Sequence, residues 1–110
     1  MDNNQIQILK PNGILDATTS QELRTQITEF MNSGAKVVLV DLQNITFMDS
    51  SGLGSLVLAF KSLRAVDSQL LICSVNEQIR ILFELTGMDK IFTVFLNQEE
   101  FNQSLLSRSQ

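Results

Sequence analysis

Hydrophobic and polar positions follow two different periods along the chain, and each change of period marks a change of element. Short apolar runs rich in β-branched residues predict strands, whereas apolar residues three or four positions apart predict amphipathic helices. Strands are therefore predicted at Ile6–Leu9, Ile14–Leu15, Lys36–Leu42, Gln69–Val75 and Ile91–Leu96. Helices are predicted from Thr19 to Ser33, from Asp49 to Arg64, from Asn76 to Gly87 and from Asn97 onward. This alternation is typical of an α/β layer structure.

The order of these elements also predicts how the strands pair. Because helices join most consecutive strands, the strands are expected to be parallel, with right-handed crossovers. The apolar run Lys36–Leu42 is typical of a strand covered on both faces, so we place it at the centre of the sheet. The turn at Pro11–Gly13 favours a short antiparallel β-hairpin between the first two strands. The expected fold is a mixed, mostly parallel sheet of about five strands with about four helices, and residues 1–110 are expected to form a single domain.

Several polar residues and glycines predict where the helices begin and end. Thr19 and Glu22 have the spacing of a capping box for the first helix. Asn76 is expected to cap the third helix, and Gly87 to end it. Met88 follows this helix-ending glycine and is therefore expected to meet solvent or a partner.

The composition excludes several kinds of catalytic and metal site. The 110-residue chain has no His and one Cys, so it lacks the commonest general base, the commonest metal ligand and any paired thiols. Triads that need His, zinc sites and redox dithiols are therefore excluded, and we expect neither a metal nor a cofactor. The lone Cys73 lies in an apolar run and is expected to be a small buried side chain.

The charge balance bears on partners and on location. Twelve Asp and Glu against eight Lys and Arg give a formal net charge of -4, and the cations do not cluster in the sequence, so nucleic acid is not an expected partner. No apolar run reaches the ~20 residues that a membrane-spanning helix needs. Residues 1–10 lack the features of a signal peptide. We therefore expect a soluble, cytoplasmic protein that does not insert into a membrane.

Polar and small residues gather between the predicted central strand and the next helix, where α/β folds place binding sites. Asp49 or Ser50 is expected to cap this helix, and Gly52 and Gly54 to allow another backbone or a bulky group to approach closely. The unpaired N–H groups of a first helical turn would tolerate a phosphate on Ser50 or Ser51. The residues alone favour a simpler alternative, a capped helix start with no further role.

Four stretches of the chain resemble a known family. Val38–Leu42 and the following Phe47–Gly54, with its Asp-Ser-Ser-Gly-Leu core, resemble the signature of the STAS domain, specifically of the single-domain anti-sigma factor antagonists of bacteria. Gly13–Asp16 and Leu85–Phe92 resemble two further parts of that family, so the resemblance covers essentially the whole chain. It implies the STAS fold.

The resemblance implies a regulatory role and no catalysis by the chain itself. In that family the Ser directly after the Asp is phosphorylated by a partner that is both a serine kinase and an anti-sigma factor. The matching residue here is Ser50, with Ser51 as the fallback. Unphosphorylated protein would bind this kinase and release a sigma factor, phosphorylation would block the binding, and a protein phosphatase would restore it. A phosphate adds roughly -1.5 to -2 charges beside Asp49 and so disfavours the same contacts.

The partner-binding face implied by the resemblance includes more than the phosphorylated residue. Asp16 and Thr18 correspond in place to family residues near the phosphorylated loop, although helix capping is an alternative role for both. Asp49 is expected both to cap the helix and to orient the Ser50 hydroxyl. The isolated protein is expected to be a monomer. The partner-binding residues are therefore expected to be Asp16, Thr18, Asp49, Ser50, Ser51 and Gly52.

Other interpretations share parts of this pattern. A phosphoacceptor receiver domain also ends a buried strand with Asp, as Asp41 does, but it needs a carboxylate pair after its first strand, where this chain has Pro11–Gly13. Asp41 is equally well explained as a strand-end residue that is hydrogen-bonded to the neighbouring loop. STAS domains also serve as scaffolds of stress-signalling assemblies and as regulatory or accessory subunits of membrane transporters. The sequence leaves this last alternative open.

Overall fold

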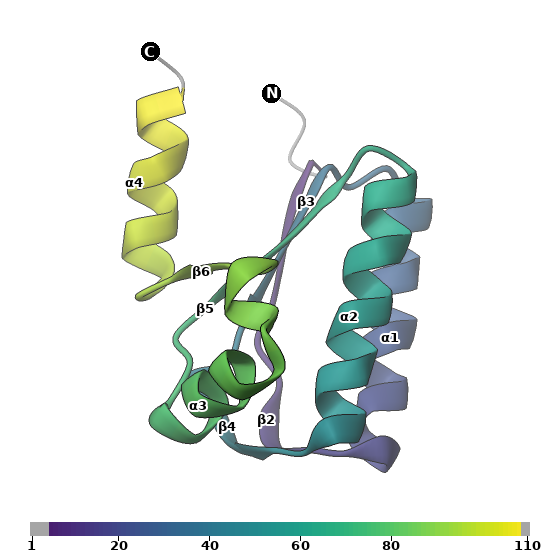
Figure 1. Cartoon of the computed structure of the whole chain (residues 1–110). Coiled ribbons are helices and arrows are strands. Elements are labelled where there is room, and N and C mark those ends of the chain that lie inside the picture. Colours follow the sequence, from purple (N-terminus) through teal and green to yellow (C-terminus); the bar gives the residue numbers. More distant parts are fainter. Residues whose placement is uncertain (1–4, 109–110) are drawn as a thin grey trace.

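A computed structural model describes residues 5–108 of the chain (Figure 1). The predicted α/β alternation and the four predicted helices are confirmed. In chain order the elements are β1 (Ile6–Leu9), β2 (Asn12–Leu15), α1 (Ala17–Asn32), β3 (Val37–Asp41), β4 (Asn44–Met48), α2 (Ser50–Ala65), β5 (Gln69–Cys73), α3 (Glu77–Thr86), the 3-10 turn η1 (Met88–Lys90), β6 (Thr93–Phe95) and α4 (Gln98–Arg108).

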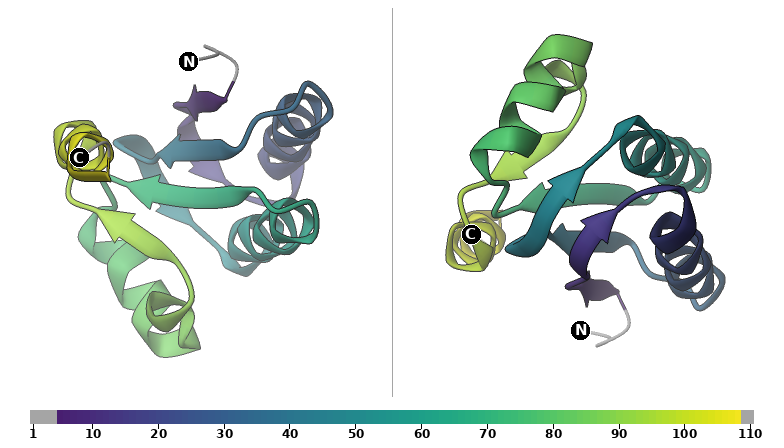
Figure 2. Two further views of the ribbon diagram at one scale, coloured as in Figure 1. Left: turned by 90° about the horizontal axis from the view of Figure 1, so that it is seen from above. Right: turned by 90° about the horizontal axis from the view of Figure 1, so that it is seen from below.

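The strands form two sheets whose pairings are parallel. The larger sheet has four strands in the order β1-β3-β5-β6, and the smaller sheet pairs β2 with β4. Because β3 lies between β1 and β5, the predicted central strand is confirmed. Helices α1 and α2 cover one face of the larger sheet and α4 lies on the other (Figure 1), as the views from above and below also show (Figure 2).

The two opening strands are present, but they pair with other strands and not with each other. Leu9 of β1 lies opposite Val40 of β3, and Leu15 of β2 lies opposite Met48 of β4. The antiparallel pairing expected between β1 and β2 is therefore replaced by two parallel pairings. The chain leaves the larger sheet at Pro11, which cannot donate the N–H that a hairpin ladder would need. This path brings both Leu9 and Leu15 into the core.

Strand β4 is an element that the hydrophobic pattern does not predict. Its buried residues are Ile45 and Met48, three positions apart, so the strict alternation of a strand is missing from the sequence. The partner strand β2 carries a register shift between Gly13 and Ile14. Gly13 has a φ of 88°, a conformation that favours glycine. This irregular pairing matters because β4 leads directly into α2.

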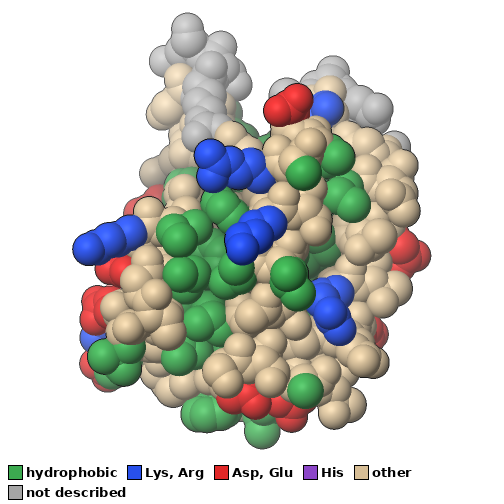
Figure 3. All heavy atoms as spheres, turned by 45° about the vertical axis from the view of Figure 1, so that its right-hand side comes forward, with side chains coloured by type: hydrophobic (Ala, Val, Ile, Leu, Met, Phe, Trp, Pro, Cys, Tyr) green, Lys and Arg blue, Asp and Glu red, His purple; other side chains and the backbone are tan. Residues whose placement is uncertain are grey.

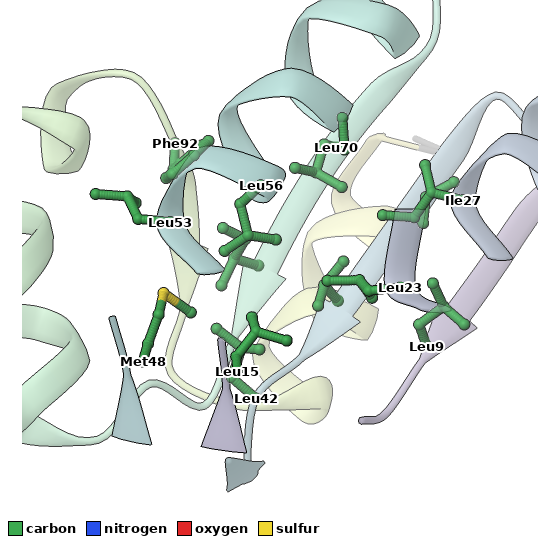
Figure 4. Close-up of a cluster of buried hydrophobic side chains, with 14 of the residues drawn as sticks. Leu9, Leu15, Leu23, Ile27, Leu42, Met48, Leu53, Leu56, Leu70 and Phe92 are labelled. Carbon is green, nitrogen blue, oxygen red and sulfur yellow. The ribbon is translucent and has the colours of Figure 1, made fainter. Parts of the chain in front are cut away.

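The main core lies between the larger sheet and helices α1 and α2. Leu15 and Met48 of the smaller sheet reach the same cluster, so the two sheets share one core. Figure 4 shows these side chains close to Leu53 and Leu56 of α2. A second, smaller cluster lies on the opposite face of the larger sheet, where Phe101 of α4 packs against Leu39, Leu71 and Cys73.

The region after α3 also differs in detail from the prediction. Gly87 ends α3 as predicted, with a φ of 76°. Residues 88–90 then form η1, and the Phe92 N–H donates to the Met88 carbonyl at 2.9 Å. The last strand is consequently shorter than the predicted Ile91–Leu96.

Candidate functional site

Helix α2 begins directly after β4, and Asp49 is its N-cap. The Asp49 carboxylate accepts a hydrogen bond from the Gly52 N–H at 2.9 Å. The Asp49 carbonyl accepts the first helical bond, from the Leu53 N–H at 3.0 Å. The carboxylate thus satisfies one of the donors that a helix start leaves unpaired. The predicted capping role of Asp49 is confirmed.

Gly52 lies in the first turn of α2, against the backbone of β2. A Cβ at this position would overlap the carbonyl oxygen of Leu15 and would lie 3.0 Å from its carbonyl carbon. Only glycine leaves room for this backbone, so the predicted close approach is confirmed. The same prediction is wrong for Gly54, where an added Cβ would meet no atom of the described neighbours within 4 Å.

Helix α1 begins at Ala17, and Asp16 is its N-cap. The Asp16 carboxylate accepts hydrogen bonds from the N–H groups of Thr18 at 3.0 Å and Thr19 at 3.1 Å, and Thr19 Oγ1 accepts from the Asp16 N–H at 3.0 Å. Asp16 and Thr19 therefore form the capping box, not the predicted Thr19 and Glu22, because the helix begins earlier than predicted. The hydrogen bond from the Thr19 N–H also lowers the pKa of the Asp16 carboxyl.

The pairing of β2 with β4 brings these two helix starts together. Leu15 immediately precedes Asp16, and its carbonyl accepts the Asp49 N–H at 3.2 Å. Both starts consequently lie at the same end of the molecule, the lower end in Figure 1. The tertiary structure thus gathers the residues predicted for the site, which are Asp16, Thr18, Asp49, Ser50, Ser51 and Gly52.

Ser50 and Ser51 lie on the outer side of the α2 start. Both residues are exposed, and neither hydroxyl makes a hydrogen bond to another residue within 5–108. The expected orientation of the Ser50 hydroxyl by Asp49 is therefore not seen, because the carboxylate bonds to the Gly52 N–H. The two hydroxyls remain accessible from solvent.

An open groove of about 660 Å³ begins at the two serines and runs between α1, α2 and the end of α3. Its lining includes Arg24 of α1, Val57 and Leu58 of α2, and Met88 of η1. The i, i+3, i+4 spacing along α2 groups Val57 with the buried Leu53 and Leu56, but Val57 is only half-buried. Leu58 is 53% exposed, and the sequence signal that could have identified it is its place outside the i, i+3, i+4 spacing of the buried Leu53 and Leu56. Met88 lines the groove, in agreement with its predicted contact with solvent or a partner.

Two side-chain amides hold the outer edge of β4, a feature that the sequence does not indicate. Gln78 Nε2 donates to the Met48 carbonyl at 2.8 Å, and Gln78 Oε1 accepts the Met48 N–H at 2.9 Å. Asn76 Nδ2 donates to the carbonyls of Ile45 and Thr46, each at 3.2 Å. These bonds satisfy backbone groups that a neighbouring strand would otherwise pair. They fix β4 just before the start of α2.

Asp41 lines a different hollow, together with Lys10 and Gln98. The residue is 1% exposed, and its carboxylate accepts hydrogen bonds from the Gln43 N–H at 3.0 Å and from Gln98 Nε2 at 2.7 Å. Burial acts to raise the pKa of Asp41, but these hydrogen bonds outweigh it and hold the pKa below its ordinary value. The predicted bond to the neighbouring loop is confirmed, and Asp41 also ties the start of α4 to the sheet. Cys73 is buried as predicted, and burial raises the pKa of its thiol.

Residues 5–108 contain neither a candidate metal site nor a candidate membrane-spanning helix. They hold no cluster of three or more Cys, Asp or Glu side chains placed to bind a metal ion. None of their helices combines the length and the apolar character required to cross a membrane.

The fold and the site define a small α/β binding domain that presents exposed hydroxyls at a capped helix start, beside a partly apolar groove. The chain belongs to the STAS domain family, whose model matches residues 2–101. It is similar to the anti-sigma-B factor antagonist of Staphylococcus aureus, with 37% identity over 86 residues that cover 78% of this chain and 80% of that protein.

Solved structures of other STAS proteins have the same fold. The anti-sigma factor antagonist SpoIIAA in its unphosphorylated form gives a TM-score of 0.78 at 19% identity, covering 94% of this chain and 91% of that one. SpoIIAA from Bacillus in the phosphorylated form gives 0.72 at 19% identity, covering 94% and 95%. The STAS domain of a SulP transporter from Vibrio cholerae gives 0.77 at 13% identity, covering 100% and 89%. At these identities the likeness shows the fold alone, so the predicted STAS fold is confirmed and a transporter role is not favoured.

Proposed function

We propose that this protein is an anti-sigma factor antagonist that acts by phosphorylation-controlled binding. Unphosphorylated protein binds an anti-sigma factor that is also a serine kinase, and a sigma factor is released. Phosphorylation blocks this binding, and a protein phosphatase restores it. The observation that carries the proposal is the 37% identity to an anti-sigma-B factor antagonist, which extends over 78% of this chain and 80% of that relative.

The proposed phosphoacceptor is Ser50, with Ser51 as the fallback. Its exposed hydroxyl makes no hydrogen bond within residues 5–108, so a kinase can reach it without breaking an internal contact. Because it lies in the first turn of α2, the partial positive charge of the helix start favours a phosphate there. The same hydroxyl lacks a hydrogen-bonded base in the described part of the chain, which supports a role as a substrate and not as a catalytic nucleophile. We therefore propose that the chain is not an enzyme.

The proposed binding face surrounds this serine. Thr18 and Ser51 are exposed, and Asp16 and Asp49 are partly so, which supports contact with a partner by all four. Gly52 is buried, and its proposed part is to hold the α2 start against β2.

The proposed switch is local. A phosphate adds roughly -1.5 to -2 charges beside Asp49 and Asp16, so repulsion and desolvation disfavour docking of the same surface. Leu53 and Leu56 anchor α2 in the core, which supports a switch without rearrangement of the fold. We also propose that residues 1–110 act as one STAS domain, as a monomer, in the cytoplasm where sigma factors act.

Phosphorylation of defined variants by the purified anti-sigma factor kinase of the source organism tests the assignment. Tandem mass spectrometry is expected to locate phosphate on Ser50 in the wild type and in the matched control Ser51→Ala. No phosphate is expected in Ser50→Ala. Full labelling of Ser50→Ala, with phosphate confined to Ser51, would contradict the assignment.

Calorimetry with the same kinase tests the binding role. Ser50→Asp is expected to weaken binding by at least about tenfold, which corresponds to ~1.4 kcal/mol. Ser50→Ala is expected to bind like the wild type. Absence of kinase binding, with recovery of a transporter ATPase or permease subunit in a co-purification, would support the role in a transporter assembly instead.

A further inference from the structure

A second hollow continues along α2, beyond the groove that begins at the serines. We call this hollow the α2 furrow, and it is lined by Phe60, Arg64, Asp67, Leu70, Ile91 and Thr93. Its walls come from the C-terminal half of α2, from β5 and from the segment that leads into β6. Ile91 is 47% exposed, Phe60 is half-buried and Leu70 is buried, so the furrow has an apolar floor that solvent can reach.

Cationic side chains lie along this face of the molecule. Arg64 lines the furrow, and Lys61 lies about one helical turn before Arg64 in α2. Lys90 directly precedes Ile91, which also lines the furrow. Arg24 lines the groove below. Figure 3 shows Lys and Arg side chains on both sides of a band of hydrophobic side chains on this face. The eight cations look scattered in the sequence, but the fold places Arg64 in the furrow and Arg24 in the adjoining groove, with Lys61 and Lys90 next in sequence to furrow residues.

These four cations are not neutralised by ion pairs within the described part of the chain. The ion pairs found there both belong to a fifth cation, Arg80, which bonds to Glu77 and Glu84 of its own helix. Asp67 lines the furrow without pairing with Arg64. A face that carries unpaired cations in a chain of net charge -4 attracts anionic groups from outside.

We propose that the α2 furrow binds an acidic segment of the anti-sigma kinase. Carboxylates of this segment lie against Lys61, Arg64 and Lys90, and its apolar side chains lie on Phe60 and Ile91. The unpaired cations select an acidic partner, and the apolar floor selects a protein segment over a small free anion. This inference rests on the proposed function, because it names the part of the partner that docks beside the phosphorylated serine.

The charges along α2 also give the bound segment a direction. The start of α2 carries Asp49, with Asp16 held beside it, whereas the other end of the helix carries Lys61 and Arg64. The acidic end of the segment therefore lies at the C-terminal half of α2. A phosphate on Ser50 increases the negative charge at the opposite end.

Binding of the purified anti-sigma kinase to two matched double variants tests the proposal. Lys61→Gln with Arg64→Gln removes two positive charges from the furrow, and Lys10→Gln with Arg80→Gln removes two from elsewhere. The furrow variant is expected to bind roughly tenfold more weakly at low salt, mainly through a slower association rate. The deficit is expected to shrink at about 0.5 M salt, where the Debye length is only a few ångströms. The control variant is expected to bind like the wild type.

Other outcomes contradict the furrow proposal, the proposed function or both. Equal binding by both double variants, while Ser50→Asp still loses binding, overturns the furrow proposal and leaves the proposed function intact. Absence of kinase binding by the wild type overturns both. If the furrow variant keeps kinase binding but loses binding to vesicles of phosphatidylserine that the wild type binds, the furrow is a lipid-binding surface and the proposal is also overturned.

Discussion

The two helix starts that meet at the end of the smaller sheet use the same kind of cap and differ in what they leave exposed. Asp16 and Asp49 both accept N–H groups of the first turn of a helix. At α1 the Thr19 hydroxyl is engaged, because it donates to the Ile14 carbonyl at 2.7 Å and accepts the Asp16 N–H at 3.0 Å. At α2 the Ser50 hydroxyl has no partner within residues 5–108.

This difference follows from position in the helix and not from residue type. Thr19 is the third residue of α1, from which a side chain reaches back to the cap. Ser50 and Ser51 are the first two residues of α2, and the third is Gly52, which has no side chain. The Leu15 carbonyl occupies the space that a side chain at Gly52 would need. At the start of α1 the Thr19 hydroxyl is hydrogen-bonded to the backbone. At the start of α2 the Leu15 carbonyl packs against Gly52, and the hydroxyls of Ser50 and Ser51 have no partner within residues 5–108.

The largest effect is expected from filling the space at Gly52. Gly52→Ala places a Cβ against the Leu15 carbonyl, so strand and helix must move apart, and we expect a loss of about 2 to 3 kcal/mol in the free energy of unfolding. Gly54→Ala is the matched control, since its Cβ meets no described neighbour, and it is expected to stabilise α2 by up to ~1 kcal/mol. Urea unfolding measures both. Similar midpoints for the two variants would contradict the role of Gly52.

Removal of the caps compares the two helix starts directly. Asp49→Ala is expected to cost about 1 kcal/mol, the usual value of an N-cap. Asp16→Ala is expected to cost more, because Asp16 accepts two backbone N–H groups whereas Asp49 accepts one. Asn at either position keeps a side-chain acceptor and serves as the control. A larger loss for Asp49→Ala in urea unfolding would reverse this comparison.

Removal of the hydroxyls gives a smaller effect and separates their roles. Thr19→Ala loses the bonds to Ile14 and Asp16 and is expected to cost about 1 kcal/mol in thermal or urea unfolding. Ser50→Ala breaks no bond to a described residue and is expected to change stability by less than ~0.5 kcal/mol. A loss at Ser50 equal to that at Thr19 would mean that Ser50 has a structural partner.

The pH dependence of stability is expected to reveal the cap of α1 as the smallest effect. The pKa of Asp16 is lowered in the folded state, so its contribution is present above the unfolded pKa of about 3.9 and is lost as the pH falls through the folded pKa. Asp16→Asn removes this titration, and the urea midpoint of that variant is expected to fall less steeply between about pH 5 and pH 2. An unchanged slope would argue against the hydrogen bonds of the Asp16 carboxylate.

The candidate site was predictable to the extent that its signals are local. Asp49, Ser50 and Gly52 stand together between a buried strand and an amphipathic helix, and that pattern alone predicts a capped helix start that would tolerate a phosphate. The contribution of Asp16 needed the family resemblance, because nothing in the residues between Asp16 and Asp49 indicates that they meet. The amide contacts of Gln78 with β4 left no sequence signal at all, since an exposed helix commonly carries a polar residue at such a position.

The sequence by itself determined the four helices and every strand except β4, because the period of their apolar residues depends only on neighbours along the chain and indicates which face of each of these elements is buried. Only the tertiary structure decided that β1 and β2 join different sheets, that the Leu15 carbonyl meets Gly52, and that Arg64 and Ile91 line one furrow. The pairing of distant strands depends on the burial gained by the whole core against the entropy of closing the loops between them. A short stretch of sequence does not determine this balance between burial and loop-closure entropy.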